Sequence, residues 1–157
     1  AGLTRLLTTA TIHTVIGQVY DTVGGFPEHL DAEGQLDLMH RNKTGSLIQA
    51  ACEMGAVCAD ATESDKKAIA AFGRAAGLMF QIVDDLIDID GCPDLVGKAV
   101  GKDADMGKLT FPGVVGDEAS RQAIETLRQV AADALKSLNS RGEDLKTVTE
   151  WMAQRTH

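Results

Sequence analysis

Apolar residues recur at steps of three and four along the first part of the chain. Between Gly2 and Val23 the positions of this pattern are Leu3, Leu6, Leu7, Ile12, Val15, Ile16, Val19 and Val23. Such spacing returns apolar side chains to one side of a helix that has about 3.6 residues per turn. The pattern therefore predicts an amphipathic helix over residues 2–23.

Turn-forming residues divide the rest of the chain into further helical segments. Glycines and a proline follow Val23, an Asp31-x-x-Gly34 turn leads into the second helix, and Thr62-Glu63-Ser64-Asp65 is an amino-terminal capping signal for the third. The helices predicted after the first run from about Gln35 to Ala59, from Thr62 to Ile89, from Asp117 to Leu138, and from beyond Arg141-Gly142-Glu143 to Met152. No alternating strand pattern occurs, so the sequence predicts an all-α protein of five helices.

The segment between Asp90 and Gly116 is predicted to be a functional loop. It holds six glycines and two of the three prolines, too many for a continuous helix. Three Gly-Lys pairs, ending in Lys98, Lys102 and Lys108, suit a flap that closes over phosphate oxygens. Their spacing is not that of a P-loop, and a solvated surface loop is the plainer alternative.

An acidic cluster, Asp84-Asp85-x-x-Asp88, lies inside the apolar pattern of the third helix. Asp84 and Asp88 are one helical turn apart, so the three carboxylates are expected to converge, with Gln81 one turn earlier. Oxygen ligands without a nearby His or Cys favour a hard cation such as Mg²⁺. A solvated acidic helix end is the bland alternative, whereas an EF-hand fails because its first and last ligand positions would be Leu86 and Gly97.

A lysine interrupts the apolar side of the second helix. The apolar line consists of Leu36, Met39, Leu47, Ala50 and Met54. Lys43 is four residues from both Met39 and Leu47, so it is expected to face the core. It either extends its charge outward along its aliphatic stem or meets an anion.

Composition and charge narrow the classes of function. The formal charge is −8, which argues against a nucleic-acid surface, and the apolar residues are mainly aliphatic, as in closely packed helices. Three cysteines without C-x-x-C spacing suggest neither a disulfide framework nor a zinc site and favour a cytoplasmic setting. No run of 18 apolar residues occurs, so stable membrane insertion is not expected.

Two further features carry no function by themselves. Gln18 and Asp21 share a face of the first helix at a spacing of three. The four histidines, His13, His29, His40 and His157, show no ligand spacing and are interpreted as structural or surface residues.

Four motifs in order give the chain a resemblance to the trans-isoprenyl diphosphate synthases. They are Gly17-Gln18-x-x-Asp21, His40-Arg41-Asn42-Lys43-Thr44-Gly45, Phe80-Gln81-x-x-Asp84-Asp85-x-x-Asp88 and Gly101-x-Asp103-x-x-x-Gly107-Lys108-x-Thr110-Phe111-Pro112. The resemblance covers nearly the whole chain. It implies an isoprenoid-synthase helical bundle, usually a homodimer, that condenses an allylic diphosphate with isopentenyl diphosphate, using Mg²⁺ to draw the diphosphate away from an allylic cation.

The resemblance also implies roles for individual residues. The metal ligands would be Asp84, Asp85 and Asp88, with Asp21 near the metals through water. The allylic diphosphate would contact Lys43, Thr44, Lys98 and Lys108. Gln81 and Thr44 would steady the developing cation by their dipoles. The register of Lys102 and Asp103 in the loop varies between branches of the family.

The family pattern also contains parts that do not occur in this sequence. A first Asp-rich motif followed by paired arginines is absent. The basic residues with which the family binds isopentenyl diphosphate, nearer the amino terminus of the family pattern, are absent as well. We therefore expect residues 1–157 to be the carboxyl-terminal part of a single isoprenoid synthase domain and to be inactive alone. A non-catalytic regulatory or partner subunit of the same family is the alternative, and a helical interaction domain with chance motifs is a third possibility.

Overall fold

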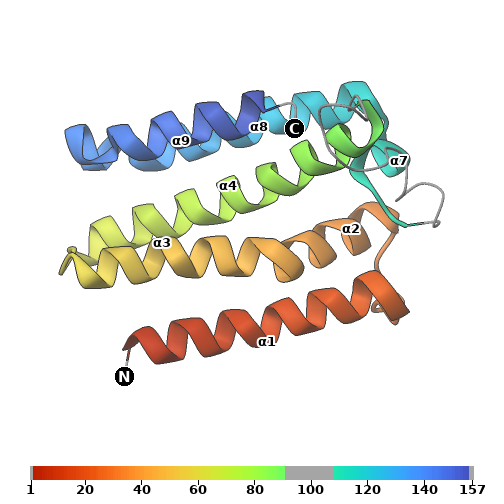
Figure 1. Cartoon of the computed structure of the whole chain (residues 1–157), viewed down its shortest axis with the longest axis horizontal. Helices are drawn as coiled ribbons and strands as arrows, with labels where there is room; N and C mark the ends of the chain where they lie inside the picture. Colours follow the sequence, from red (N-terminus) through yellow and green to blue (C-terminus); the bar gives the residue numbers. More distant parts are fainter. Residues whose placement is uncertain (1, 91–107, 156–157) are drawn as a thin grey trace.

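The computed structural model describes residues 2–90 and 108–155. These residues form helices and their connections, arranged as a layered array in which most helices run alongside one another (Figure 1). The elements are α1 (Gly2–Val23), α2 (Ala32–His40), the π-helical turn η1 (Arg41–Gly45), α3 (Ser46–Cys58), α4 (Glu63–Asp90), α7 (Phe111–Val115), α8 (Asp117–Leu135), the 3₁₀ segment η2 (Lys136–Gly142) and α9 (Glu143–Gln154). The predicted all-α class is confirmed, and no strand occurs in the described ranges.

The long helix α4 lies at the centre of the array and packs against α3 on one side and α8 on the other. One core cluster joins α4 to the carboxyl-terminal helices through Phe72, Met79 and Val83 against Leu135 and Met152. A second cluster consists of Leu36, Met39, Leu78, Ile82 and Phe111, and it joins α4 to α2 and α7. Because both clusters use α4, this helix fixes the positions of the elements on either side of it.

Side-chain caps begin α2, α4 and α7, whereas α3, α8 and α9 begin without one. The Thr62 Oγ1 atom accepts a hydrogen bond from the Asp65 amide at 3.1 Å, as predicted for the start of α4. Asp31 accepts from the Gly34 amide at 2.9 Å and caps α2, which therefore begins at Ala32 and not near Gln35. The loop predicted between 90 and 116 contains the short helix α7, capped by Thr110, and its residues 91–107 lie outside the described part of the chain.

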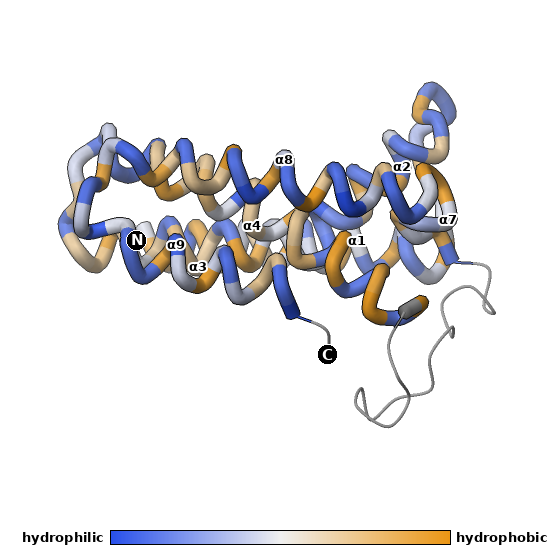
Figure 2. Tube along the Cα trace, turned by 90° about the horizontal axis from the view of Figure 1, so that it is seen from above, coloured by the Kyte–Doolittle hydropathy of each residue, from blue (hydrophilic) through white to orange (hydrophobic). Residues whose placement is uncertain are grey.

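The large apolar residues of α1 are mostly exposed. Its buried residues are Ala10 and Gly17, which are small, whereas the exposed large apolar residues are Leu3, Leu7, Ile12, Val15, Ile16, Val19 and Val23. Figure 2 shows apolar positions along this outer helix as well as along the inner ones. The helix was located correctly, but it approaches α3 and η1 with small residues, because only these permit close backbone contact.

The predicted second helix is divided by η1. Within Arg41–Gly45 the helical turn is π-helical, so the side chains after it are rotated relative to those before it. Leu36 and Met39 are buried as expected, yet Leu47 is 40% exposed. Ala50 is buried and Met54 is half-buried, so the apolar line expected through Lys43 continues after the π-turn but loses Leu47. π-turns within helices often occur at functional sites.

Candidate functional site

Lys43 lies on η1 and forms an ion pair with Asp21 of α1. The distance from Lys43 Nζ to Asp21 Oδ2 is 2.8 Å, and the two side chains are 30% and 7% exposed. Gln18 Nε2 lies 3.4 Å from the same carboxylate oxygen, in agreement with the shared face predicted for Gln18 and Asp21. Gln18 and Asp21, which carried no function by themselves in the sequence, thus lie beside Lys43, and the Lys43 side chain stays partly exposed.

Glycines on both neighbouring helices allow η1 to approach them closely. A Cβ atom on Gly17 would lie 2.5 Å from the Lys43 Cα atom and 2.8 Å from the Asn42 carbonyl carbon. On the other side, a Cβ atom on Gly77 of α4 would lie 2.8 Å from the Gly45 Cα atom. These distances are far below ordinary carbon contacts of about 3.5–4.0 Å. The position of Lys43 between α1 and α4 therefore depends on backbone packing at these glycines.

The three aspartates of the acidic motif have different environments. Asp85 is buried, and its Oδ2 atom accepts hydrogen bonds from the Phe111 amide at 2.8 Å and from His40 Nε2 at 3.1 Å. The Asp84 side chain is 60% exposed, and Asp88 is half-buried. Across residues 2–90 and 108–155, no three His, Cys, Asp or Glu side chains are grouped closely enough to hold a metal ion. The expected convergence of three carboxylates is therefore not seen, because Asp85 turns inward.

His40 is part of this buried polar cluster, which the interpretation of the sequence missed. Its Nδ1 atom lies 3.3 Å from the Gln81 side-chain oxygen, and its ring stacks on Phe111 with centroids 5.6 Å apart. The residue is only 3% exposed. A signal was present, because His40 follows Leu36 by four residues and so lies on the buried side of α2.

Arg155 was also missed, because 71 residues separate it from its partner. Its guanidinium lies 4.1 Å above the Phe80 ring centroid, and one terminal nitrogen is 3.0 Å from Asp84 Oδ1. Its Nε atom is buried and finds no hydrogen-bond partner among the described residues. Asp84, expected to be the first metal ligand, therefore already has a cationic neighbour.

The remaining predicted residues have simpler outcomes. Thr44 and Lys108 are half-buried, and Gln81 is buried with its amide oxygen facing His40. Lys98, with Lys102 and Asp103, lies outside the described residues. The part of the site that the structure describes thus contains Lys43, Thr44, Gln81, Lys108 and the aspartates.

The residues present fit a magnesium site only in part. Asp84 and Asp88 offer oxygen donors one helical turn apart on α4, and Mg²⁺ is commonly held by one or two carboxylates together with water and phosphate oxygens. Asp85 does not fit this arrangement, since its carboxylate is enclosed by His40 and Phe111. A metal at this place would need its further ligands from a bound phosphate compound and water.

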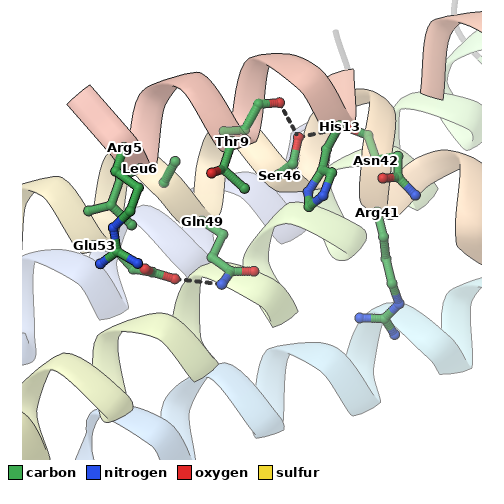
Figure 3. A pocket seen from close by; sticks show the side chains of 11 residues that line it. Arg5, Leu6, Thr9, His13, Arg41, Asn42, Ser46, Gln49 and Glu53 are labelled. Carbon is green, nitrogen blue, oxygen red and sulfur yellow. Dashed lines mark hydrogen bonds between the residues drawn. The ribbon is translucent and has the colours of Figure 1, made fainter. Parts of the chain in front are cut away.

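A polar hollow of about 330 Å³ lies between α1 and α3 and is shown in Figure 3. Its lining includes Arg5, His13, Asn42, Ser46 and Glu53. Ser46 donates a hydrogen bond to the Ala10 carbonyl oxygen at 3.2 Å, and Gln49 donates to Glu53. Neither Lys43 nor the aspartates of α4 line this hollow, so it is separate from the predicted site.

Comparison with known proteins agrees with the class that the helical array defines, the isoprenoid synthase fold. A decaprenyl diphosphate synthase from Rhodobacter capsulatus superposes with a TM-score of 0.83 at 25% sequence identity, covering 99% of this chain and 60% of that one. Farnesyl diphosphate synthase of Micrococcus luteus is 34% identical over 156 residues, which are 98% of this chain and 53% of that protein. Geranylgeranyl pyrophosphate synthase 4 of Arabidopsis thaliana is 36% identical over 145 residues, or 86% of this chain and 39% of that protein.

The chain belongs to the polyprenyl synthetase family, whose sequence pattern matches residues 1–152. The resemblance inferred from the four motifs is thereby confirmed. The chain spans only about 39–53% of the length of the Arabidopsis and Micrococcus synthases. Within the described residues, every helix is too short or too polar to cross a membrane.

Proposed function

We propose that the intact protein is a Mg²⁺-dependent trans-prenyltransferase that condenses isopentenyl diphosphate with an allylic diphosphate to give a polyprenyl diphosphate. Family membership supports this class of reaction. The observation that carries the proposal is the partly exposed Lys43 side chain, which extends from a π-turn packed against the aspartate-bearing helix α4. Its ammonium group lies 2.8 Å from the carboxylate of the buried Asp21 side chain. A cation fixed in this way is suited to a phosphate ligand.

In this proposal some side chains bind the diphosphate group and others stabilise the allylic cation. Lys43 and Thr44 bind the allylic diphosphate, together with Lys108, which lies shortly before α7, and Lys98, which lies outside the described residues. Fixed positive charges stabilise the negative charge that grows on the leaving diphosphate. Gln81 and Thr44 direct their dipoles towards the allylic cation, and for this role the Gln81 amide oxygen has to leave its contact with His40.

Asp84 and Asp88 are the side chains proposed to hold magnesium, with Asp21 acting through water. When bound, the metal would neutralise part of the negative charge of the diphosphate. Asp84 exchanges its contact with Arg155 for that role. Asp84 is 60% exposed at this contact, but the exchange leaves the Arg155 side chain, which is only 13% exposed and lies over Phe80, without this carboxylate partner.

We further propose that residues 1–157 are the carboxyl-terminal part of one synthase domain, in a cytoplasmic protein that is a homodimer when intact. The coverage of relatives supports a part of a synthase domain, and the motifs found in the sequence support the carboxyl-terminal part. The exposed apolar side of α1 supports additional polypeptide packed over this helix, because large apolar patches usually mark an interface. The cytoplasmic setting rests on the number and spacing of the cysteines.

Calorimetric titration of the 157-residue chain with pyrophosphate tests the proposal. We expect weak binding that requires Mg²⁺ and that falls by at least about tenfold in Lys43→Ala, since a hydrogen bond to a charged group contributes about 1.5–3 kcal/mol. Lys136→Ala is the matched control, because it removes the same charge from a side chain that is 73% exposed. Equal heats with and without Mg²⁺, or equal binding by the two lysine variants, would contradict the proposal.

Turnover provides an independent test of how much of the enzyme this chain represents. We expect no product from isopentenyl and allylic diphosphates with this chain alone, because the first Asp-rich motif of the family is not in its sequence. Radiolabelled isopentenyl diphosphate and extraction of the product would detect even slow turnover. Ordinary synthase activity would show that the chain has a complete site.

A further inference from the structure

A buried polar cluster joins three separate elements of the fold. His40 ends α2, Asp85 lies on α4, and Phe111 begins α7. The Asp85 Oδ2 atom accepts from both His40 Nε2 at 3.1 Å and the Phe111 amide at 2.8 Å, while the His40 and Phe111 rings stack. Each of the three residues is at most 7% exposed.

Apolar side chains surround this polar cluster, so the Asp85 carboxylate depends on its hydrogen-bond donors within the cluster. Leu36, Met39 and Ile82 pack in the same core as Phe111. A carboxylate buried among such residues is strongly destabilised unless hydrogen-bond donors surround it, and here the donors come from two other elements. Removing either donor therefore weakens the attachment of the other element to α4.

The elements joined by the cluster carry the residues proposed to bind diphosphate. Lys43 follows His40 by three residues, and Lys108 precedes Phe111 by three. Asp84, beside Asp85 in the chain, is exposed and lies outside this enclosure. The middle aspartate of the motif thus has a different environment from its neighbour.

We propose that His40 and Asp85 are positioning residues that set Lys108 relative to Lys43, and that Asp85 does not ligate metal. The part of this inference that concerns diphosphate binding rests on the proposed function. If Asp85 bound a metal ion, its carboxylate would have to leave the Phe111 amide and His40, and both donors would remain buried without acceptors. Metal binding by Asp84 and Asp88 does not require the Asp85 carboxylate to move.

Amide hydrogen exchange in the metal-free chain tests the positioning role without reference to function. We expect exchange at the Phe111 amide to accelerate by about tenfold or more in His40→Ala, although His40 does not hydrogen-bond that amide itself. His40→Gln, whose side-chain nitrogen can still donate to Asp85, should restore most of the protection. Lys136→Ala should leave it unchanged. Unaltered exchange at Phe111 in His40→Ala would overturn the proposal, and Asp85→Asn provides the same comparison if His40→Ala does not fold.

Ligand titrations under conditions where every variant is folded separate positioning from metal ligation. For Mg²⁺-dependent pyrophosphate binding we expect His40→Ala and Asp85→Asn each to lose about tenfold in affinity, and the double variant to lose little more. For Mn²⁺ alone, followed by electron paramagnetic resonance, Asp85→Asn should match wild type while Asp84→Asn weakens binding. Loss of Mn²⁺ binding in Asp85→Asn equal to that in Asp84→Asn would show that Asp85 is a ligand. If wild type binds no pyrophosphate, the proposed function fails, and exchange at Phe111 alone decides whether the cluster positions the segment.

Discussion

The contact between α1 and η1 leads to a sharp prediction at Gly17. In Gly17→Ala the new Cβ atom would lie 2.5 Å from Lys43 Cα and 2.8 Å from the Asn42 carbonyl carbon. These neighbours are backbone atoms within a helix, so a change of side-chain rotamer cannot relieve the clash. The two elements would have to separate by about 1 Å to reach ordinary carbon contact.

The expected loss of stability results from two opposing effects. Overpacking a tight contact destabilises by about 1–3 kcal/mol, and the upper end applies here because only backbone can move. Alanine is better than glycine inside a helix by about 0.5–1 kcal/mol, which offsets part of the loss. The net result is a destabilisation of about 2 kcal/mol, or a fall of roughly 4–8 °C in Tm for a chain of this size.

Urea unfolding followed by circular dichroism at the helix band measures this change. Gly55→Ala is the matched control, since Gly55 lies inside α3 and its Cβ position has no neighbour within 4 Å. We expect the control to be stabilised by about 0.5–1 kcal/mol. If Gly17→Ala were as stable as Gly55→Ala, the close approach of α1 and η1, and with it the placement of Lys43, would be refuted.

Charged and thiol side chains elsewhere give three further predictions. The Arg141 guanidinium lowers the pKa of Asp65, so Asp65 stabilises the fold above its unfolded pKa of about 3.9, and the advantage of wild type over Asp65→Asn in urea unfolding should vanish as pH falls through the lower folded pKa. Burial raises the pKa of the Cys52 thiol, so iodoacetamide at about pH 8 should label exposed Cys58 before Cys52, as read by peptide mass spectrometry. Arg155→Ala should tighten Mn²⁺ binding by up to about fivefold in paramagnetic resonance titrations, because the ion pair of Arg155 with α4 no longer competes.

Each of these predictions has a contrary result. A difference between wild type and Asp65→Asn that persists undiminished far below about pH 3 would mean that the pKa of Asp65 is not set by Arg141. Equal labelling rates would contradict the shielding of Cys52. Weaker Mn²⁺ binding in Arg155→Ala would show that the arginine supports the metal site.

Helix positions were largely readable from local sequence. The first helix was predicted over 2–23 and is found at Gly2–Val23, and the cap at Thr62 correctly placed the start of α4. These features depend on apolar spacing and capping side chains, which act over a few residues. The carboxyl-terminal boundary was less accurate, because α8 ends at Leu135 and continues as a 3₁₀ segment in which Asn139 has a positive φ.

The inward or outward direction of side chains was predicted less well. The apolar pattern of α1 identified an amphipathic helix, but the residues that are buried in it are Ala10 and Gly17. The line through Lys43 required a regular α-helix, whereas the π-turn rotates the side chains of α3 relative to those of α2. Periodicity identifies a helix and its apolar side, but a neighbouring helix decides which side is packed.

The sequence by itself determined that this chain is all-helical, that it belongs among the prenyl diphosphate synthases, and which short motifs carry acidic and basic side chains. Only the tertiary structure decided that Lys43 pairs with Asp21 and that Asp85 is enclosed by His40 and Phe111 while Asp84 meets Arg155. The reason is physical: residue type and spacing act within one or two helical turns, whereas these contacts join residues 22 to 71 positions apart through the packing of separate helices.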